Sequence, residues 1–230
     1  MMGKTHRLVG ITTVGLLGLV DPTVHIFGTT VYPLIGIIVA DCASKIADAD
    51  LATTQYGHKY PLLSKIFSHR GFTHTTLIVL LQLLLLYAVC TGSFDNTVEL
   101  IMLFILVNSS IVASIGIKVL QHNKDLRKVI MLSPVFIFGI VALINYFRQD
   151  ITHLLLTSTM FGFIIAYGSH ILADLCNKKG VPLLFPLSKK KFHIMSVKTN
   201  TGEETVFAFC YVILAGVLFY VIKNGLVPSF

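Results

Sequence analysis

Two residues with metal-binding chemistry lie four positions apart near the end of a long apolar stretch. The segment IIAYGSHILADLCNKKG, residues 164–180, begins as hydrocarbon and ends in a basic loop, and it contains His170 and Asp174. On a helix this spacing places an imidazole and a carboxylate on one face. Ionisable side chains are costly inside a membrane and usually have a function there. The pair therefore indicates a functional site, provided that further ligands meet it.

A second group of candidate ligands lies in the polar segment 41–74. It contains an Asp-x-Asp motif formed by Asp48 and Asp50, and the sequence SHRGFTH, in which His69 and His74 flank a glycine. Asp-x-Asp places two hard oxygen ligands close together, and imidazole suits zinc or another first-row metal. A turn at the glycine could bring both imidazoles toward one centre, although a spacing of five does not place them on one helical face.

Each of these residues also has a simpler interpretation. Either aspartate of the motif could cap a helix or be a solvated loop charge, and His69 beside Arg70 could contact lipid headgroups. His170 and Asp174 could form a satisfied buried pair. His6, just before the first apolar segment, would mean little alone. The set is informative because every member is expected at the same membrane face.

The composition indicates an integral membrane protein. Of the 230 residues, 54% are hydrophobic and 13% are charged, and the mean hydropathy is +0.80; soluble domains carry about 25% charged residues. The length suits a single domain, residues 1–230. The four cysteines are widely spaced and form no CxxC pair, which argues against a disulfide framework and against a thiolate zinc site.

Seven apolar segments predict the fold class. Two short, Gly-rich segments, 8–20 and 24–40, are expected to form an N-terminal hairpin or to enter the membrane only partly. The other five are predicted to span the membrane: residues 75–91, 99–120, 129–147, 153–175 and 205–222. The expected fold is therefore an all-α, polytopic membrane helical bundle.

The distribution of Lys and Arg predicts the orientation of the chain. With a cytoplasmic N-terminus and seven passes, all of the 18 basic residues except Arg148 and Lys223 fall on the inside. This asymmetry follows the positive-inside rule. The net charge of +7 is then explained by topology, and no nucleic-acid partner is expected. Both long polar segments, 41–74 and 176–204, lie at the cytoplasmic face in this arrangement.

Several motifs, taken in order, resemble a known family. They are THRLVG near the start, ADADL, SHRGFTHTT, GSHILADLCNKKGVPLLFPL and TGEE, and they run from His6 to about Glu204. Together they resemble the YdjM-like family of bacterial membrane-bound predicted metal-dependent hydrolases, often described as LexA-regulated. That family is distantly similar to zinc-dependent phospholipase C and P1 nuclease, which are helical phosphodiesterases with clustered zinc ions.

The resemblance implies a helical site for one to three Zn²⁺ or other divalent ions. The implied ligands are His6, Asp48, Asp50, His69, His74, His170 and Asp174. Such a site could lower the pKa of a water molecule and bind the oxygens of a phosphoester. Asp48 or Asp50 could accept a proton from the attacking water. Arg70 could bind the phosphate through its guanidinium, and an anchoring role at a helix end or in lipid is an equally good use for it.

A site at the cytoplasmic face favours an amphiphilic substrate, such as a phospholipid or a lipid-linked phosphate, and membrane lipids are the expected partners. The main alternative is a non-enzymatic protein that binds or moves metal ions. Candidate ligands that gather at one face, rather than along a path through the bilayer, argue against transport. A third interpretation is a scaffold in which a buried His–Asp pair only fixes helix packing.

Overall fold

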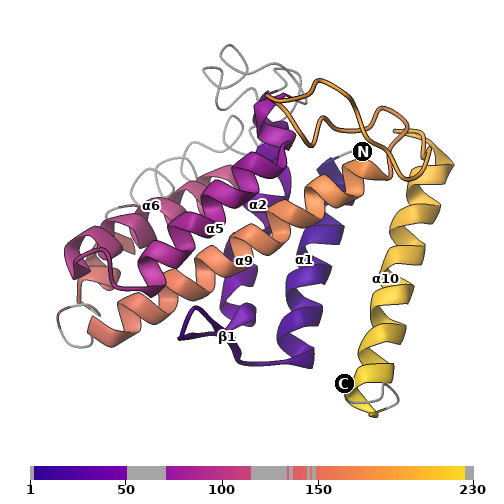
Figure 1. Ribbon diagram of the computed structural model, residues 1–230. Coiled ribbons are helices and arrows are strands. Elements are labelled where there is room, and N and C mark those ends of the chain that lie inside the picture. The colour runs from indigo at the N-terminus through magenta and orange to yellow at the C-terminus, as the bar shows by residue number, and fades with distance from the viewer. Residues whose placement is uncertain are drawn as a thin grey trace, which may run out of the picture.

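The computed structural model describes residues 3–50, 71–114, 134, 137–143, 146 and 149–225. These parts of the chain form long helices, short 3₁₀ helices and a two-stranded antiparallel sheet (Figure 1). The long helices are α1 (Gly3–Val20), α2 (Ile37–Ile46), α5 (Thr76–Cys90), α6 (Asn96–Ser114), α9 (Gln149–Leu175) and α10 (Gly202–Lys223). The short elements are β1 (Val24–Ile26), β2 (Thr29–Val31), η1 (Pro33–Gly36), η2 (Ala47–Asp50) and η3 (Phe72–His74).

The apolar segment 24–40 does not form one helix. It folds as the β1–β2 hairpin, the 3₁₀ helix η1 and the first turn of α2. Phe27 and Gly28 both have positive φ at the hairpin turn, a conformation that matches the twist of paired strands. Pro33 begins η1, where its fixed φ suits the first helical position. Local turn chemistry therefore outweighs the apolar composition of this segment.

Helix α9 is the central element, and α1, α2, α5 and α6 all pack against it. Helix α6 runs parallel to α9. This direction is shown by the pairing of Glu99, near the start of α6, with His153, near the start of α9. Helix α5 runs antiparallel to α9, since the backbone N–H of Thr76 at its start donates to the carbonyl of Leu183, which follows the end of α9. The starts of α1 and α5 and the ends of α2 and α9 therefore gather at one end of the bundle.

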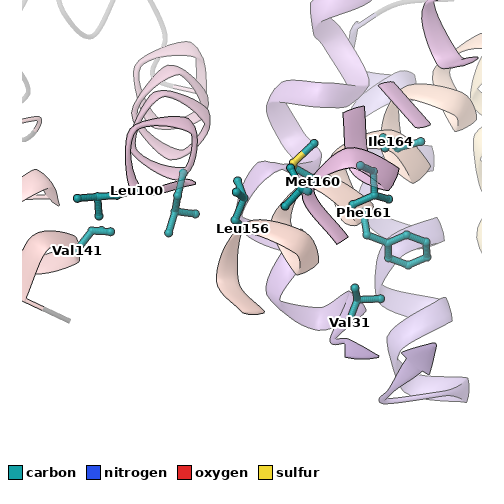
Figure 2. Close-up of a cluster of buried hydrophobic side chains, with 10 residues drawn as sticks. Val31, Leu100, Val141, Leu156, Met160, Phe161 and Ile164 are labelled. Atoms are coloured by element: carbon teal, nitrogen blue, oxygen red, sulfur yellow. The ribbon is translucent and has the colours of Figure 1, made fainter. Parts of the chain in front are cut away.

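A close glycine contact fixes η1 and α2 against α9. A Cβ added to Gly36 would lie 2.5 Å from the Cα of Gly162, and a Cβ on Gly162 would lie 2.4 Å from the Cα of Gly36. Small residues allow helices to approach this closely in membrane proteins. Further along, a hydrophobic cluster that includes Leu156, Met160 and Phe161 packs the middle of α9 against its neighbours (Figure 2).

Helix α10 stands beside α1 and apart from α5 and α6 (Figure 1). Hydrogen bonds between side chains join α10 to α1. The Thr5 hydroxyl donates to Glu204 Oε1 at 2.6 Å, and the hydroxyls of Thr13 and Tyr211 lie 2.7 Å apart. The remaining surface of α10 is largely apolar and exposed.

The prediction of five spans is wrong for the described helices. Two of them are long and apolar enough to cross a membrane, α9 from Asp150 to Leu175 and α10. Helix α5 has 15 residues, or about 22 Å, which is less than the ~30 Å hydrocarbon layer. The described apolar part of α6, Asn96–Ile111, is also short. The predicted span 129–147 lies mostly outside the described residues, and the β1–β2 hairpin corrects the all-α assignment.

Candidate metal centre

Three parts of the fold bring candidate ligands to the carboxyl end of α9. Helix η2 continues α2 and carries Asp48, whereas η3 precedes α5 and carries His74. His170 and Asp174 lie on successive turns of α9, 3.9 Å apart from Nε2 to Oδ2. The packing of α2 and α5 on α9 therefore brings together ligands that are far apart in the sequence.

These four residues form the His/Asp cluster. Each offers one ligand atom, and the four atoms lie within 4.8 Å of one another, so the cluster could hold a metal ion. His74 Nε2 is 3.3 Å from His170 Nε2, 3.6 Å from Asp48 Oδ1 and 3.5 Å from Asp174 Oδ2. His170 Nε2 is 3.8 Å from Asp48 Oδ1. The side chain of Asp48 is 14% exposed and the other three are fully buried.

The separations fit metal ligation better than direct hydrogen bonding. Most N–H···O hydrogen bonds measure about 2.7–3.2 Å. Tetrahedral N and O ligands with bonds of about 2.0–2.1 Å lie about 3.3 Å from one another. The separations between a histidine nitrogen and another ligand atom of the cluster run from 3.3 to 3.9 Å. A modest contraction around a cation would bring them to ligation distance, and this donor set suits zinc and other divalent first-row metals.

A backbone hydrogen bond sets the orientation of His170. Its Nδ1 lies 2.6 Å from the carbonyl oxygen of Ser44 on α2. Because a carbonyl can only accept, Nδ1 carries the proton and donates it. Nε2 of the neutral ring then directs a lone pair toward the other members of the cluster. Metal-binding histidines are typically held in this way through their second nitrogen.

A hydroxyl group sets the orientation of His74 in the same manner. Thr73 donates its only hydroxyl proton to Asp50 Oδ2 at 2.6 Å, so the same oxygen accepts from His74 Nδ1 at 3.0 Å. When the ring is neutral, as a metal ligand must be, its Nε2 is left for the cluster. Asp50, expected as a ligand, lies 3.5 Å from His74 Nδ1. In this arrangement Asp50 supports a ligand through Thr73. The Thr73 carbonyl is itself held by the hydroxyl of Tyr167.

His6 joins the cluster from α1. Its ring stacks on that of His170, with centroids 3.7 Å apart, and its Nε2 lies 3.4 Å from Asp174 Oδ1. The side chain is fully buried, and neither ring nitrogen has a hydrogen-bond partner among the described residues. Buried polar atoms are rarely left in that state. His6 therefore fits as a further ligand or as a group that orients Asp174.

The charges of the cluster are strongly coupled. Burial disfavours the imidazolium form of His74, but the attraction of the nearby carboxylates, Asp174 first, outweighs this and raises the pKa of His74 to about 10. Burial also opposes ionisation of Asp48, but the nearby imidazoles, His170 first, hold the pKa of Asp48 well below its usual range. A cation bound here would take the place of the proton on His74.

Two of the expected residues, His69 and Arg70, lie outside the described residues. Conversely, Ser44, Thr73 and Tyr167 were not predicted to take part. Tyr167 precedes His170 by three residues, so helical periodicity could have placed it on the same face. Thr73 adjoins His74, and this adjacency is only a weak indication in the sequence that Thr73 takes part in the site. Ser44 acts through its backbone carbonyl, and no side-chain pattern reveals such a contact.

The comparisons with known proteins place the chain in a family. No curated protein matches it, and no solved structure matches it. The similarity to phospholipase C and P1 nuclease therefore has no support from these comparisons. A family model described as YdjM inner membrane protein matches residues 1–226. This match and the two apolar helices support a membrane location. Since the match covers almost the whole sequence, the chain belongs to the YdjM family of inner membrane proteins.

Proposed function

We propose that this protein is a membrane-bound metal-dependent hydrolase that acts on a phosphoester, such as a phospholipid or a lipid-linked phosphate, at the cytoplasmic membrane face. The observation that carries the proposal is the buried His/Asp cluster, in which two imidazoles are oriented by partners outside it. The residues that would hold zinc or a similar divalent ion are Asp48, His74, His170 and Asp174. When bound, that ion would supply Lewis acidity toward the phosphoester and toward a water molecule.

The protein's own residues would have separate tasks. Asp48 is the cluster member with an exposed portion, so water and substrate would arrive on its side. Its ionised carboxylate could accept a proton from the attacking water. Asp50 and Thr73 would keep His74 in position, and Ser44 would do the same for His170.

The basic loop between the two candidate spans supports the proposed orientation. Residues 176–201 contain six lysines and no acidic residue, which favours the cytoplasmic side. The loop follows the end of α9, where the His/Asp cluster lies. His6, near the start of the chain, reaches the same cluster. A multi-pass chain with a cytoplasmic N-terminus is consistent with all three observations, and Lys189, Lys190 and Lys191 would lie near anionic lipid.

Arg70 is proposed to bind the phosphate group, because a guanidinium can donate two parallel hydrogen bonds to phosphate oxygens. Its loss should raise KM for a phosphodiester and leave the metal content unchanged. If Arg70 only anchors the chain, its loss should change neither KM nor the metal content.

The experiment that tests the proposal combines metal analysis with an activity measurement. Protein purified without added chelator is analysed for divalent metals, and it is then assayed on a phosphodiester dye and on labelled phospholipid with and without chelator. We expect bound metal and chelator-sensitive hydrolysis. Bound metal without hydrolysis would instead indicate a protein that binds or moves metal ions. If the purified protein contains no metal, the cluster would serve only to pack the helices together.

A further inference from the structure

An apolar pocket lies between α2, α5, α6 and α9, and its lining includes none of the four residues of the His/Asp cluster. Its volume is about 310 Å³. Leu156, Met160 and Phe163 of α9 line it, and most of the other described lining residues are also hydrophobic. Leu156 and Met160 are labelled in Figure 2, where they lie between the helices. An engineered apolar cavity of about 150 Å³ holds a benzene molecule, so this pocket could hold roughly ten carbon atoms.

The pocket and the cluster share one face of α9. Pocket-lining residues of α9, then Tyr167, then the two cluster residues of α9 follow one another at intervals of three and four, in the order Leu156, Met160, Phe163, Tyr167, His170 and Asp174. Such spacing defines a continuous stripe along a helix. Phe163 precedes His170 by seven residues, which is about 10 Å along the helix axis. A molecule at the cluster that extends over that distance, past the side chain of Tyr167, would enter the pocket.

Polar side chains lie at the end of the pocket nearer to the cluster. Ser109 follows Glu99 by ten residues and Phe163 follows His153 by ten. Because Glu99 pairs with His153 and the two helices are parallel, Ser109 and Phe163 lie at about the same level. Ser109 lines the pocket there.

Gln82 is the second polar residue of the wall. It lies on α5 one turn beyond Ile78 and Val79, which pack beside Tyr167, so it too is near the cluster end. Its Oε1 is buried and has no hydrogen-bond partner among the described residues. The pocket surface is therefore almost wholly apolar, and its two polar lining residues both lie toward the cluster, which suits a hydrocarbon chain whose polar end points that way.

The pocket also opens toward the outer surface of the bundle. Leu85 on α5 and Ile105 on α6 line it and are 42% and 58% exposed. The neighbouring surface carries further exposed leucines, among them Leu84 at 63%. In a membrane protein this surface faces lipid tails, because hydrocarbon covers exposed apolar side chains there. A lipid chain could enter the pocket from the bilayer between α5 and α6.

We propose that the pocket binds one acyl chain of a membrane lipid whose phosphate group reaches the His/Asp cluster. This inference rests on the proposed function and narrows its substrate to lipids with a long hydrocarbon chain. The chain runs from Phe163 toward Leu156, with Gln82 near the end of the pocket that faces the phosphate. The lipid is recognised by its phosphate group and by the hydrocarbon chain next to it.

Photo-crosslinking tests the pocket directly. The full chain is placed in phosphatidylethanolamine and phosphatidylglycerol vesicles with a phospholipid whose acyl chain carries a diazirine, and labelled residues are mapped by mass spectrometry. We expect labelling within residues 156–164. Met160→Trp, which fills the pocket, should lower that labelling at least fivefold, and Ser109→Phe should do the same from the opposite wall. Leu84→Trp, which adds the same side chain on the exposed surface, should leave it unchanged.

The outcomes separate the two proposals. If residues 156–164 are unlabelled, or if both filling variants are labelled like Leu84→Trp, the pocket does not hold a lipid chain. Chelator-sensitive hydrolysis that persists in that case would leave the proposed function intact. If hydrolysis occurs, Met160→Trp should lower the ratio of long-chain to short-chain phospholipid turnover at least tenfold, and an unchanged ratio would overturn the substrate assignment. Labelling without any hydrolysis would overturn the proposed function and keep the lipid site.

Discussion

The two ends of α9 both carry a histidine next to a buried carboxylate, but the two arrangements differ. At the amino end, His153 Nδ1 lies 2.8 Å from Glu99 Oε1, an ordinary hydrogen-bond distance between one donor and one acceptor. At the carboxyl end, His170 faces several groups at 3.3–3.9 Å, and its other nitrogen is held by Ser44. The pair at the amino end needs no further partner, whereas the ligand atoms at the carboxyl end converge on a common centre.

This difference teaches how a packing pair and a ligand set can be told apart. A pair that serves packing reaches its best hydrogen-bond distance because nothing lies between its members. A ligand set has its atoms held slightly apart and oriented by outside partners, because a cation belongs between them. The comparison predicts that changes at the carboxyl end alter metal binding and that changes at the amino end alter stability alone.

The largest effect is expected from Asp174→Ala. This change removes a ligand and leaves His6 and His74 without the carboxylate that both approach. Loss of a supporting partner already costs about 10–100-fold in metal affinity, so loss of a ligand should cost more than about 100-fold. Glu99→Ala is the matched carboxylate deletion at the other end of α9. Metal titration of both variants should show a loss in the first only, and equal affinities would remove the distinction between the two ends.

The next effect is expected from Thr73→Val, which keeps the shape of the side chain and removes its hydroxyl. His74 Nδ1 and Asp50 both lose the hydrogen bond through Thr73. Metal affinity should fall about 10–100-fold.

Thr157→Val is the control for this substitution, since the Thr157 hydroxyl bonds to carbonyls of its own helix. It should leave the affinity unchanged. If Thr73→Val binds metal as tightly as Thr157→Val does, the hydroxyl does not orient His74.

The sequence predicted some parts of this arrangement and missed others for identifiable reasons. The apolar segments 153–175 and 205–222 correspond to α9 and α10, because long apolar runs without turn residues have few alternatives to a helix. Segment 24–40 is equally apolar, yet Gly28 and Pro33 divide it into a hairpin and a 3₁₀ turn. Mean hydropathy is averaged over a whole segment, so it does not reveal the effect of single turn residues such as these.

The candidate site shows the same limit. The spacing of His170 and Asp174 predicted a shared helical face, and the two side chains do lie across one turn. Their approach to His74 depends on the packing of α5 on α9, which no local pattern specifies. The Ser44 carbonyl that orients His170 belongs to the backbone and is equally invisible in the sequence.

A pH dependence of metal binding should sharpen the comparison further. The pKa of His74 is raised from 6.5 to about 10, so the metal-free protein carries this proton at neutral pH. A metal ligand must be the neutral imidazole, and binding therefore releases the proton. Apparent affinity should rise about tenfold per pH unit between about pH 7 and pH 9. Glu99→Ala should keep this slope, and a flat profile in the unaltered protein would contradict the assignment of His74 as a ligand.

The smallest effect is expected at the amino end of α9. His153→Phe keeps an aromatic ring and removes the hydrogen bond to Glu99 between α6 and α9. Hydrogen bonds between membrane helices contribute about 0.6 kcal/mol, and up to about 1.7 kcal/mol. His153→Phe should lower the free energy of unfolding by an amount within this range. His193→Phe on the exposed loop should change the free energy of unfolding by less than about 0.5 kcal/mol. Metal affinity should be the same in both variants. A loss of metal in His153→Phe would show that the two ends of α9 are coupled, and the distinction between a packing pair and a ligand set would then fail.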